Sequence, residues 1–384
     1  MNIKYEHKST FLILGLYLII NGFSFNLFAQ GNYTCGTSLS ANQKEEFIRL
    51  VKSCDKPLSK VSILDSIVPL KYHVISFSDS SGGIDSNEVL NEINNLNQIF
   101  DPAGISFQHC GAINFIYSDH YASFERQEDE IICNAYDMPN VVNIYLVPEL
   151  YKIQDNQEIQ LCGYTYYFGE YNRLIIRNSC AINGSSLAHE LGHYFSLLHT
   201  HETSLGEELV QRVNCLQAGD ELCDTPADPG LSEDNVTQNC FYIGNDVDAS
   251  GESYSPDTDN IMSYSRKTCR SSFTSEQIER MKNYFFGYRN YLFCIEKGNL
   301  ISDSDNLQFI LFPNPGKNNI ALITNQEKSK LYSYKLFDIA GKVIHEQTIS
   351  NYSFLDISFL DIGTYFVVLE DASNFAIKKL IKSQ

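Results

Sequence analysis

Residues 188–200 of this chain read Ala-His-Glu-Leu-Gly-His-Tyr-Phe-Ser-Leu-Leu-His-Thr. On a helix, His189 and His193 are four positions apart, so both imidazoles project from one face towards the same point. Glu190 is offset by one position, so its carboxylate can reach a metal-bound water rather than the metal. His199 follows six residues after His193, where a chain that leaves the helix and turns back can deliver a third imidazole. Three protein ligands and a water form the open arrangement of a catalytic zinc, so the stretch predicts a zinc centre with Glu190 as general base.

A chance pattern is the alternative explanation for this stretch. The chain has nine histidines, and a chance His-Glu-x-x-His is expected in roughly one such sequence in a hundred. The third histidine makes coincidence rarer by a further factor of about 40, which favours a metal site. A catalytically dead zinc site or a structural metal stays open, although structural zinc sites are more often closed by cysteine.

The stretch resembles the long zinc motif of the metzincin peptidases, His-Glu-x-x-His-x-x-Gly-x-x-His, with one departure. Ser196 stands where that family has glycine. Glycine there allows a left-handed turn out of the helix, which serine adopts only at some cost. The resemblance implies a metzincin α/β fold, with a twisted mixed sheet, helices and an active-site cleft, and it implies peptide-bond hydrolysis.

Metzincins also carry a methionine-containing turn below the zinc, and residues 260–264 (Asn-Ile-Met-Ser-Tyr) resemble it. The resemblance implies that Met262 forms an apolar floor under the three imidazoles, where a thioether packs easily. It also implies that Tyr264 stabilises the oxyanion of the tetrahedral intermediate. An isolated Met-x-Tyr would indicate ordinary core packing, and only the spacing after the zinc motif favours the turn.

Further residues narrow the resemblance to the pappalysin family, including its bacterial ulilysin-like members. They are Gly219-Asp220, Asp224-Thr-Pro226, Cys269 and the run Phe273-Thr-Ser-Glu-Gln-Ile-Glu-Arg-Met281. In that family the segment with Gly-Asp and Asp-Thr-Pro helps to bind calcium. The resemblance therefore implies Asp220 and Thr225 as calcium ligands.

Lys267 is a specificity candidate through the same resemblance. Family members that cleave before arginine or lysine have an acidic residue two positions before the cysteine that follows the methionine turn. Lys267 holds that position here, with Arg266 beside it. Because like charges repel, we expect basic residues after the scissile bond (position P1′) to be disfavoured, and small, apolar or acidic ones to be accepted. The alternative is that Lys267 points into solvent and pocket shape alone decides.

Cysteines indicate both the destination and a latency switch. The chain has eleven, which fits an oxidising compartment, and one thiol is left over if all the others pair. Cys35 lies apart from the rest, and Cys35-Gly-Thr37 resembles a motif in pappalysin pro-segments. The resemblance implies that its thiolate occupies the water position on zinc and blocks catalysis. An unpaired or intermolecular cysteine is the alternative.

Length and composition predict processing segments and two folded modules in the 384 residues. Residues 1–29 are typical of a secretory signal peptide, because Lys4 and Lys8 precede a short apolar core and Ala29 offers a cleavage site. The apolar run is short for a membrane anchor, and no later stretch could span a bilayer. We expect a pro-segment at 30–62, the catalytic domain at 63–296 and a polar linker at 297–306.

Local patterns predict the elements around the zinc helix. We expect a short helix at 45–51 and strands at 68–75, 141–147 and 173–177. A capping box at Asp85 and Glu88 should open a helix that ends before 101–104. Ser185 or Ser186 should cap the zinc helix. One face of the capping-box helix is expected to carry Val89, Leu90, Ile93, Leu96, Ile99 and Phe100.

Residues 307–384 have a different composition, without cysteine and with eight lysines against seven acidic residues. Strand-like runs at 309–312, 319–324, 334–337, 342–345, 365–369 and 375–381 predict a small β-sandwich. Phe312-Pro-Asn-Pro315, Gly341-Lys-Val-Ile344 and Leu360-Asp-Ile-Gly-Thr-Tyr365 resemble the C-terminal sorting domain of the type IX secretion system. The resemblance therefore implies the type IX secretion machinery as a partner of this chain. A carbohydrate-binding or adhesive sandwich is the alternative.

The net charge of −19 therefore comes from the residues before 307, which argues against nucleic acid or an anionic membrane as partner. Together these features predict a secreted zinc endopeptidase that acts on proteins or peptides. The alternative is a non-catalytic secreted binding or adhesive protein that retains a metal site.

Overall fold

The computed structural model describes residues 33–54, 66–169, 171–182, 184–289, 291–292, 294, 307–312, 314–324, 331–350, 352–371 and 374–383. The expected signal peptide (1–29) and linker (297–306) lie outside these residues, so they and the exact domain boundaries stay predictions. No helix in the described part of the chain is both long and apolar enough to cross a membrane.

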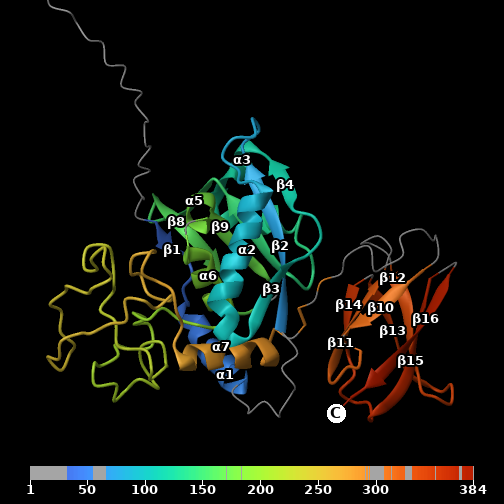
Figure 1. Ribbon diagram of the computed structural model, residues 1–384. Helices are drawn as coiled ribbons and strands as arrows, with labels where there is room; N and C mark the ends of the chain where they lie inside the picture. The colour runs from blue at the N-terminus through green and yellow to red at the C-terminus, as the bar shows by residue number, and fades with distance from the viewer. Residues whose placement is uncertain are drawn as a thin grey trace, which may run out of the picture. The chain divides into compact units, whose positions relative to one another are not determined.

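A twisted mixed sheet forms the first module (Figure 1). Its strand order is β3-β2-β6-β9-β8-β7-β5, with β1 paired to β8 and β4 paired to β2. Strands β3, β2, β6 and β9 are parallel, whereas β8 runs antiparallel to β9 and β7. The strands are β1 (Thr34–Cys35), β2 (Ser66–Ser76), β3 (Ile105–His109), β4 (Asn114–Tyr117), β5 (Ser123–Glu125), β6 (Val142–Val147), β7 (Glu149–Gln154), β8 (Gln157–Thr165) and β9 (Arg173–Arg177).

Burial explains why β6 and β9 form the centre of this sheet. All of their residues are buried, which is typical of parallel strands covered on both faces. The expected α/β class is confirmed. The helices are α1 (Ala41–Cys54), α2 (Ser86–Phe100), α3 (Asp119–Ala122), α4 (Asp129–Cys133), α5 (Asn178–Ala181), α6 (Ser186–Tyr194) and α7 (Ser275–Gly287), with 3-10 turns η1 (Asp101–Ala103) and η2 (Arg126–Glu128).

Helix α2 begins as the sequence predicts. Asp85 accepts hydrogen bonds from the backbone of the first turn, and Glu88 accepts one from the Asp85 N–H, which completes the capping box. Val89 and the apolar residues that follow at helical spacing are buried, but the prediction for Leu90 is wrong because its side chain is 48% exposed. Leu90 follows Val89 by one position, which turns it about 100° away from the buried stripe.

Helix α6, which carries the zinc motif, starts differently from the prediction. Ser185 is its N-cap residue, yet no side-chain cap bond forms. The Ser185 hydroxyl instead donates to the Lys267 carbonyl at 3.3 Å. The expected serine cap is therefore wrong, and Ser185 ties the helix to a later loop.

The chain between α6 and α7 forms turns and isolated bridges, drawn from green to orange in Figure 1. Disulfides Cys215–Cys223 and Cys240–Cys269 hold this segment, while Cys162–Cys180 and Cys110–Cys294 hold the rest of the module. Cys35 and Cys133 are free thiols. The expectation of a single left-over thiol is therefore wrong, because Cys133 is free as well as Cys35.

The second module consists of two antiparallel sheets. One has the order β10-β11-β14 and the other β13-β12-β15-β16. Buried residues of both sheets share one apolar core, which includes Phe309, Leu322, Leu336 and Val367. The predicted sandwich is confirmed, although the sequence analysis missed β14. The strands are β10 (Phe309–Phe312), β11 (Asn319–Thr324), β12 (Leu331–Phe337), β13 (Val343–Ser350), β14 (Tyr352–Asp356), β15 (Gly363–Glu370) and β16 (Phe375–Lys382).

Candidate metal centre

The turn at the end of α6 directs the chain back towards the helix. Ser196 adopts a φ of 72°, which is left-handed backbone. Its N–H donates to the His193 carbonyl at 2.9 Å, and the Leu197 N–H donates to the Gly192 carbonyl at 2.9 Å. This pair of bonds is a Schellman turn, in which serine takes the place usually held by glycine. The buried Ser196 hydroxyl has no hydrogen-bond partner among the described residues.

This turn brings His199 to the two helical histidines. The ligand atoms of Cys35, His189, His193 and His199 all lie within 4.8 Å of one another. Nε2 of His193 is 3.1 Å from Nε2 of His189 and 3.1 Å from Nε2 of His199. The structure therefore brings together the three predicted zinc ligands and the predicted latency cysteine.

Hydrogen bonds to backbone carbonyls set the protonation of two of these rings. His189 Nδ1 lies 2.7 Å from the Ile261 carbonyl, and His193 Nδ1 lies 2.7 Å from the Leu197 carbonyl. A carbonyl oxygen only accepts, so each Nδ1 donates and each Nε2 presents a lone pair to the shared point. Burial lowers the pKa of all three imidazoles, to about 3 for His193. Converging lone pairs on neutral imidazoles fit a zinc ion.

The methionine turn lies directly against α6. Met262 is fully buried, and a Cβ on Gly192 would lie 2.4 Å from its sulfur, so only glycine lets the two segments approach so closely. Asn260 fixes the turn because its side chain accepts from the Met262 N–H at 2.9 Å and exchanges hydrogen bonds with Gln277 at 3.0 and 3.2 Å. The turn is thus tied to the capping box of α7, which Gln277 completes.

Tyr264 lies beside the histidine cluster, as the resemblance implied. Its ring centroid is 4.9 Å from that of His199 and 6.1 Å from that of His189. The His201 ring stacks on His199 at 4.9 Å and contacts Tyr264 at 4.4 Å. The sequence analysis missed His201, although its position two residues after His199 was a usable signal.

Glu190 also lies at the cluster, where the N-terminal segment covers it. Its side chain is buried, and burial raises its pKa to about 7. The Thr37 hydroxyl donates to Glu190 Oε2 at 3.0 Å, and the Cys35 sulfur lies 3.6 Å from the same oxygen. Two residues of one short segment therefore contact the predicted general base.

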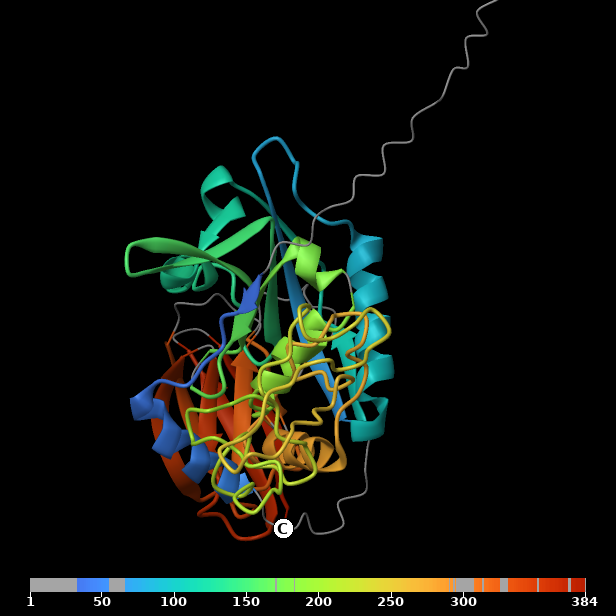
Figure 2. The ribbon, with the colours of Figure 1, turned by 90° about the vertical axis from the view of Figure 1, so that its left-hand side faces the viewer.

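That segment occupies the edge of β8. Strand β1 pairs in parallel with β8, and the Gly36 N–H donates to the Gly163 carbonyl at 2.8 Å. Figure 2 shows the short blue strand beside the green one. The Thr165 N–H donates to the Thr37 hydroxyl at 3.0 Å, and Arg126 donates to the Gly36 carbonyl at 2.6 Å. The edge that carries the metal cluster can therefore bind an extended chain.

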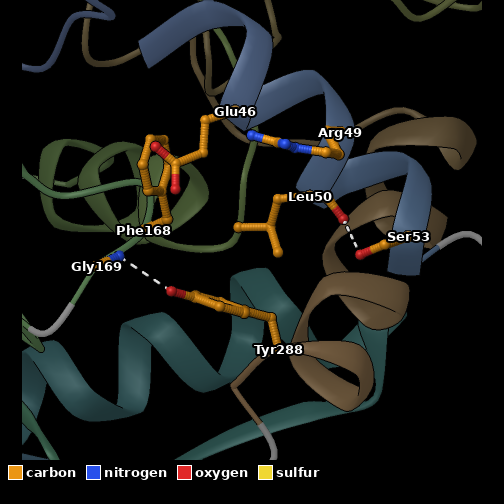
Figure 3. A pocket seen from close by; sticks show the side chains of 7 residues that line it. All are labelled: Glu46, Arg49, Leu50, Ser53, Phe168, Gly169 and Tyr288. Carbon is orange, nitrogen blue, oxygen red and sulfur yellow. Dashed lines mark hydrogen bonds between the residues drawn. The ribbon is translucent and has the colours of Figure 1, made fainter. Parts of the chain in front are cut away.

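Helix α1 docks beside the cluster through a small apolar patch. Phe47 contacts Tyr167 edge-on, with ring centroids 5.1 Å apart, and the Tyr167 hydroxyl lies 3.2 Å from His193 Nδ1. Next to this patch a pocket of about 340 Å³ is lined by Glu46, Arg49 and Leu50 of α1 together with Phe168 and Tyr288 (Figure 3). Helix α1 therefore contributes to a buried apolar cluster and borders a surface pocket.

The predicted calcium ligands Asp220 and Thr225 lie together, with a third group that the sequence analysis missed. The Thr225 hydroxyl donates to Asp220 Oδ1 at 2.9 Å. Asp220 Oδ2 and Glu208 Oε1 are buried and have no hydrogen-bond partner among the described residues. Burial raises the pKa of both carboxyl groups to about 7, and Asp220 contributes to the shift of Glu208. Buried oxygens without partners are what a calcium ion requires.

Lys267 lies half-buried near the start of α6 rather than in solvent. Its Nζ is 3.4 Å from the Cys180 sulfur, which is a weak acceptor. Arg266 points elsewhere, because it donates to the Val236 carbonyl at 2.6 Å and forms an ion pair with Glu233 at 3.3 Å. Of the two cations, only Lys267 can contribute to a pocket beside α6.

Comparisons with known proteins identify two matching families along the chain. Residues 126–285 match the model of peptidase family M43, described as pregnancy-associated plasma protein-A, and residues 310–383 match a model described as a secretion system C-terminal sorting domain. An extracellular metalloprotease of Sordaria macrospora is 27% identical over 275 residues, which cover 67% of this chain and 89% of that protein. One of Neurospora crassa is 25% identical over 275 residues, with the same 67% and 89% shares. The structure of metalloproteinase-II from Bacteroides fragilis is 14% identical in sequence, and the match covers 46% of this chain and 56% of that chain. Its TM-score of 0.24 is too low to inform on the fold.

Proposed function

Because the chain belongs to the pappalysin family of metalloproteases and carries a secretion sorting domain, we propose that it is a secreted zinc endopeptidase. Proteins and peptides are its substrates. The observation that carries the proposal is the convergence of three imidazole Nε2 atoms beside Glu190, at a sheet edge able to bind an extended chain.

Zinc binding is assigned to the side chains with converging lone pairs. In this proposal His189, His193 and His199 hold the ion through Nε2, and Met262 packs beneath them. When bound, zinc supplies Lewis-acid activation of a water and of the scissile carbonyl. The buried carbonyl acceptors on Nδ1 keep His189 and His193 in the tautomer that such binding requires.

Proton transfer is assigned to Glu190. Its carboxylate follows His189 on α6 and contacts Cys35, which belongs to the histidine cluster, so it lies where a metal-bound water would be. Glu190 takes a proton from the attacking water and then delivers it to the leaving amine. Tyr264, beside His199, donates a hydrogen bond to the oxyanion.

Cleavage within a chain follows from the path of residues 34–37. They run along β8 with Cys35 at the histidine cluster, so polypeptide lies on both sides of the reacting position. An extended substrate has the same room once this segment leaves. We assign residues 30–62 to a pro-segment in which Cys35, beside the three histidines, would be a further zinc ligand in place of water.

Calcium is proposed as a structural cofactor at Asp220, Thr225 and Glu208. We expect saturating calcium to raise the melting temperature by roughly 5 °C or more, because an ion at 100 times its Kd adds about 2.7 kcal/mol to stability. Asp220→Asn should abolish this increase, since it removes one of the two buried carboxylates that have an oxygen without a partner among the described residues. The measurement is differential scanning calorimetry with calcium and with chelator.

The matched control is Asp234→Asn, which neutralises an exposed carboxylate in the same irregular segment. It should keep the calcium response. The site would be refuted if calcium left the melting temperature of the wild type unchanged. It would also be refuted if calcium raised the melting temperature of Asp220→Asn as much as that of the wild type.

Export through the type IX machinery is proposed for residues 307–384, the part that contains the sorting domain. Deleting these residues should leave an active protease that accumulates in the periplasm of its host, because the two modules have separate cores. Activity in the medium and in the periplasmic fraction is measured with one peptide substrate. Delivery to the medium at the level of the full chain would reject this role.

A further inference from the structure

Two half-buried cations follow the methionine turn and lie close to the start of α6. Arg270 donates from Nη1 to the Ser263 carbonyl at 3.1 Å and from Nη2 to the Ser186 hydroxyl at 3.4 Å. Ser186 is the first residue of α6 and precedes Glu190 by four positions, so both lie on one face of the helix. The guanidinium of Arg270 therefore lies about one helical turn from the proposed general base.

The hydrogen bonds of Arg270 leave most of its donors unused. A guanidinium has five N–H donors, of which these two contacts use two. Its Nε is buried and has no partner among the described residues. Burial lowers the pKa of Arg270 to about 10, because no group supplies enough compensation for its lost hydration.

Lys267 adds a second cation to the same place. Burial and repulsion from Arg270 together lower its pKa to about 8, against the opposing effect of the Glu233 charge. No described carboxylate forms an ion pair with Arg270 or Lys267, whereas the neighbouring Arg266 has Glu233. Desolvated cations in folded proteins are normally paired, so Arg270 and Lys267 are two cations without an ion-pair partner among the described residues.

We propose that Arg270, with Lys267 beside it, binds a carboxylate of the peptide substrate at the P1′ position, and that the enzyme prefers to cleave before aspartate or glutamate. This inference rests on the proposed peptidase function. Arginine binds a carboxylate through short, charge-assisted hydrogen bonds, and the unused N–H donors of Arg270 can form them. A basic P1′ side chain would instead meet two cations.

Hydrogen bonds place Arg270 near the reacting centre, because Ser263 precedes Tyr264 and Ser186 lies one helical turn before Glu190. The charges of Cys35, Glu190 and Tyr264 act on Arg270 in agreement with this placement. A purely structural arginine that only tied Ser263 to Ser186 would affect every substrate alike. A carboxylate-binding arginine changes the ratio between an acidic substrate and its uncharged isostere.

The test compares kcat/KM of the mature enzyme for internally quenched peptides that differ only at P1′. One arm pairs aspartate with asparagine, and glutamate with glutamine, inside a longer chain. The other arm pairs a free C-terminal carboxylate after P1′ with its amide, because a chain terminus offers the same chemistry. We expect an acidic-to-neutral ratio of about 10 or more in the first arm, which corresponds to one charge-assisted interaction.

Variants identify the cation responsible. Arg270→Gln should bring the ratio close to 1, and Arg270→Lys should restore part of it. Arg266→Gln is the matched control, because it removes one cation from the same loop but outside the pocket, and it should keep the ratio. Should Arg270→Gln not fold, Lys267→Asp provides the second test and should lower the ratio while raising cleavage before arginine.

An acidic-to-neutral ratio above 1 in either arm supports carboxylate recognition. The arm that shows it tells whether the carboxylate belongs to the P1′ side chain or to the chain terminus. A wild-type enzyme that cleaves the peptides with ratios near 1 in both arms would overturn the inference and leave the peptidase function intact. Absence of any cleavage would count against the peptidase function itself. A ratio that Arg270→Gln does not change would overturn the role of Arg270.

Discussion

Replacing Glu190 by alanine or glutamine in the mature enzyme is expected to lower kcat/KM about 1,000-fold, because general-base catalysis contributes factors of this order. Zinc content should stay unchanged, since the ligand atoms belong to His189, His193 and His199. The measurement pairs peptide hydrolysis with metal analysis of the same sample. Glutamine keeps the shape of the buried side chain, so it separates the loss of the base from a packing defect.

Tyr264→Phe is the matched comparison for Glu190. It removes one hydroxyl beside His199 and should lower kcat by about 10- to 100-fold with little change in KM, because oxyanion donors act in the transition state. Glu190→Gln with activity close to wild type would remove Glu190 from the mechanism. A Tyr264→Phe enzyme with an altered KM alone would assign Tyr264 to substrate binding.

Replacing Cys35 by alanine in the precursor is expected to shorten the lag before activity by about tenfold or more, since the thiolate would no longer compete with water for zinc. Its sulfur lies within 4.8 Å of the histidine ligand atoms, and no other described cysteine belongs to this cluster. The measurement follows peptide hydrolysis and self-processing of purified precursor over time.

Cys133→Ala is the control, because it removes a buried free thiol inside the catalytic core and should not alter the lag. Thr37 holds Glu190 through its hydroxyl at 3.0 Å, so some latency should persist until Thr37→Val is added to Cys35→Ala. A Cys35→Ala precursor with the lag of the wild type would leave Cys35 without this role.

Much of the metal centre could be predicted from local spacing. Two histidines four apart share a helix face wherever the helix lies, and the Schellman turn at Ser196 is local because its bonds join residues within 192–197. The capping box at Asp85 was equally local and forms as predicted. Family resemblance added Met262 and Tyr264. These residues reach the site because the chain returns to α6 after a long irregular segment, which the spacing of residues alone does not predict.

Groups contributed by distant segments could not be predicted in this way. Thr37 meets Glu190 across 153 positions of sequence, and Arg270 meets Ser186 across 84. Glu208 and Arg270 lie in irregular loops whose course depends on disulfides such as Cys240–Cys269, for which sequence offers no periodicity. Ser185 does not cap the helix because its own backbone is helical, with φ −83° and ψ −6°, whereas a capping residue is normally extended.

Digestion of a proteome-derived peptide library by the purified, zinc-loaded mature enzyme tests the central claim most directly. The proposed function predicts cuts inside the peptides by the wild-type enzyme and none above background by Glu190→Gln at equal zinc content. Wild-type enzyme that binds zinc but makes no internal cuts would contradict it, as would cuts by Glu190→Gln at the wild-type rate.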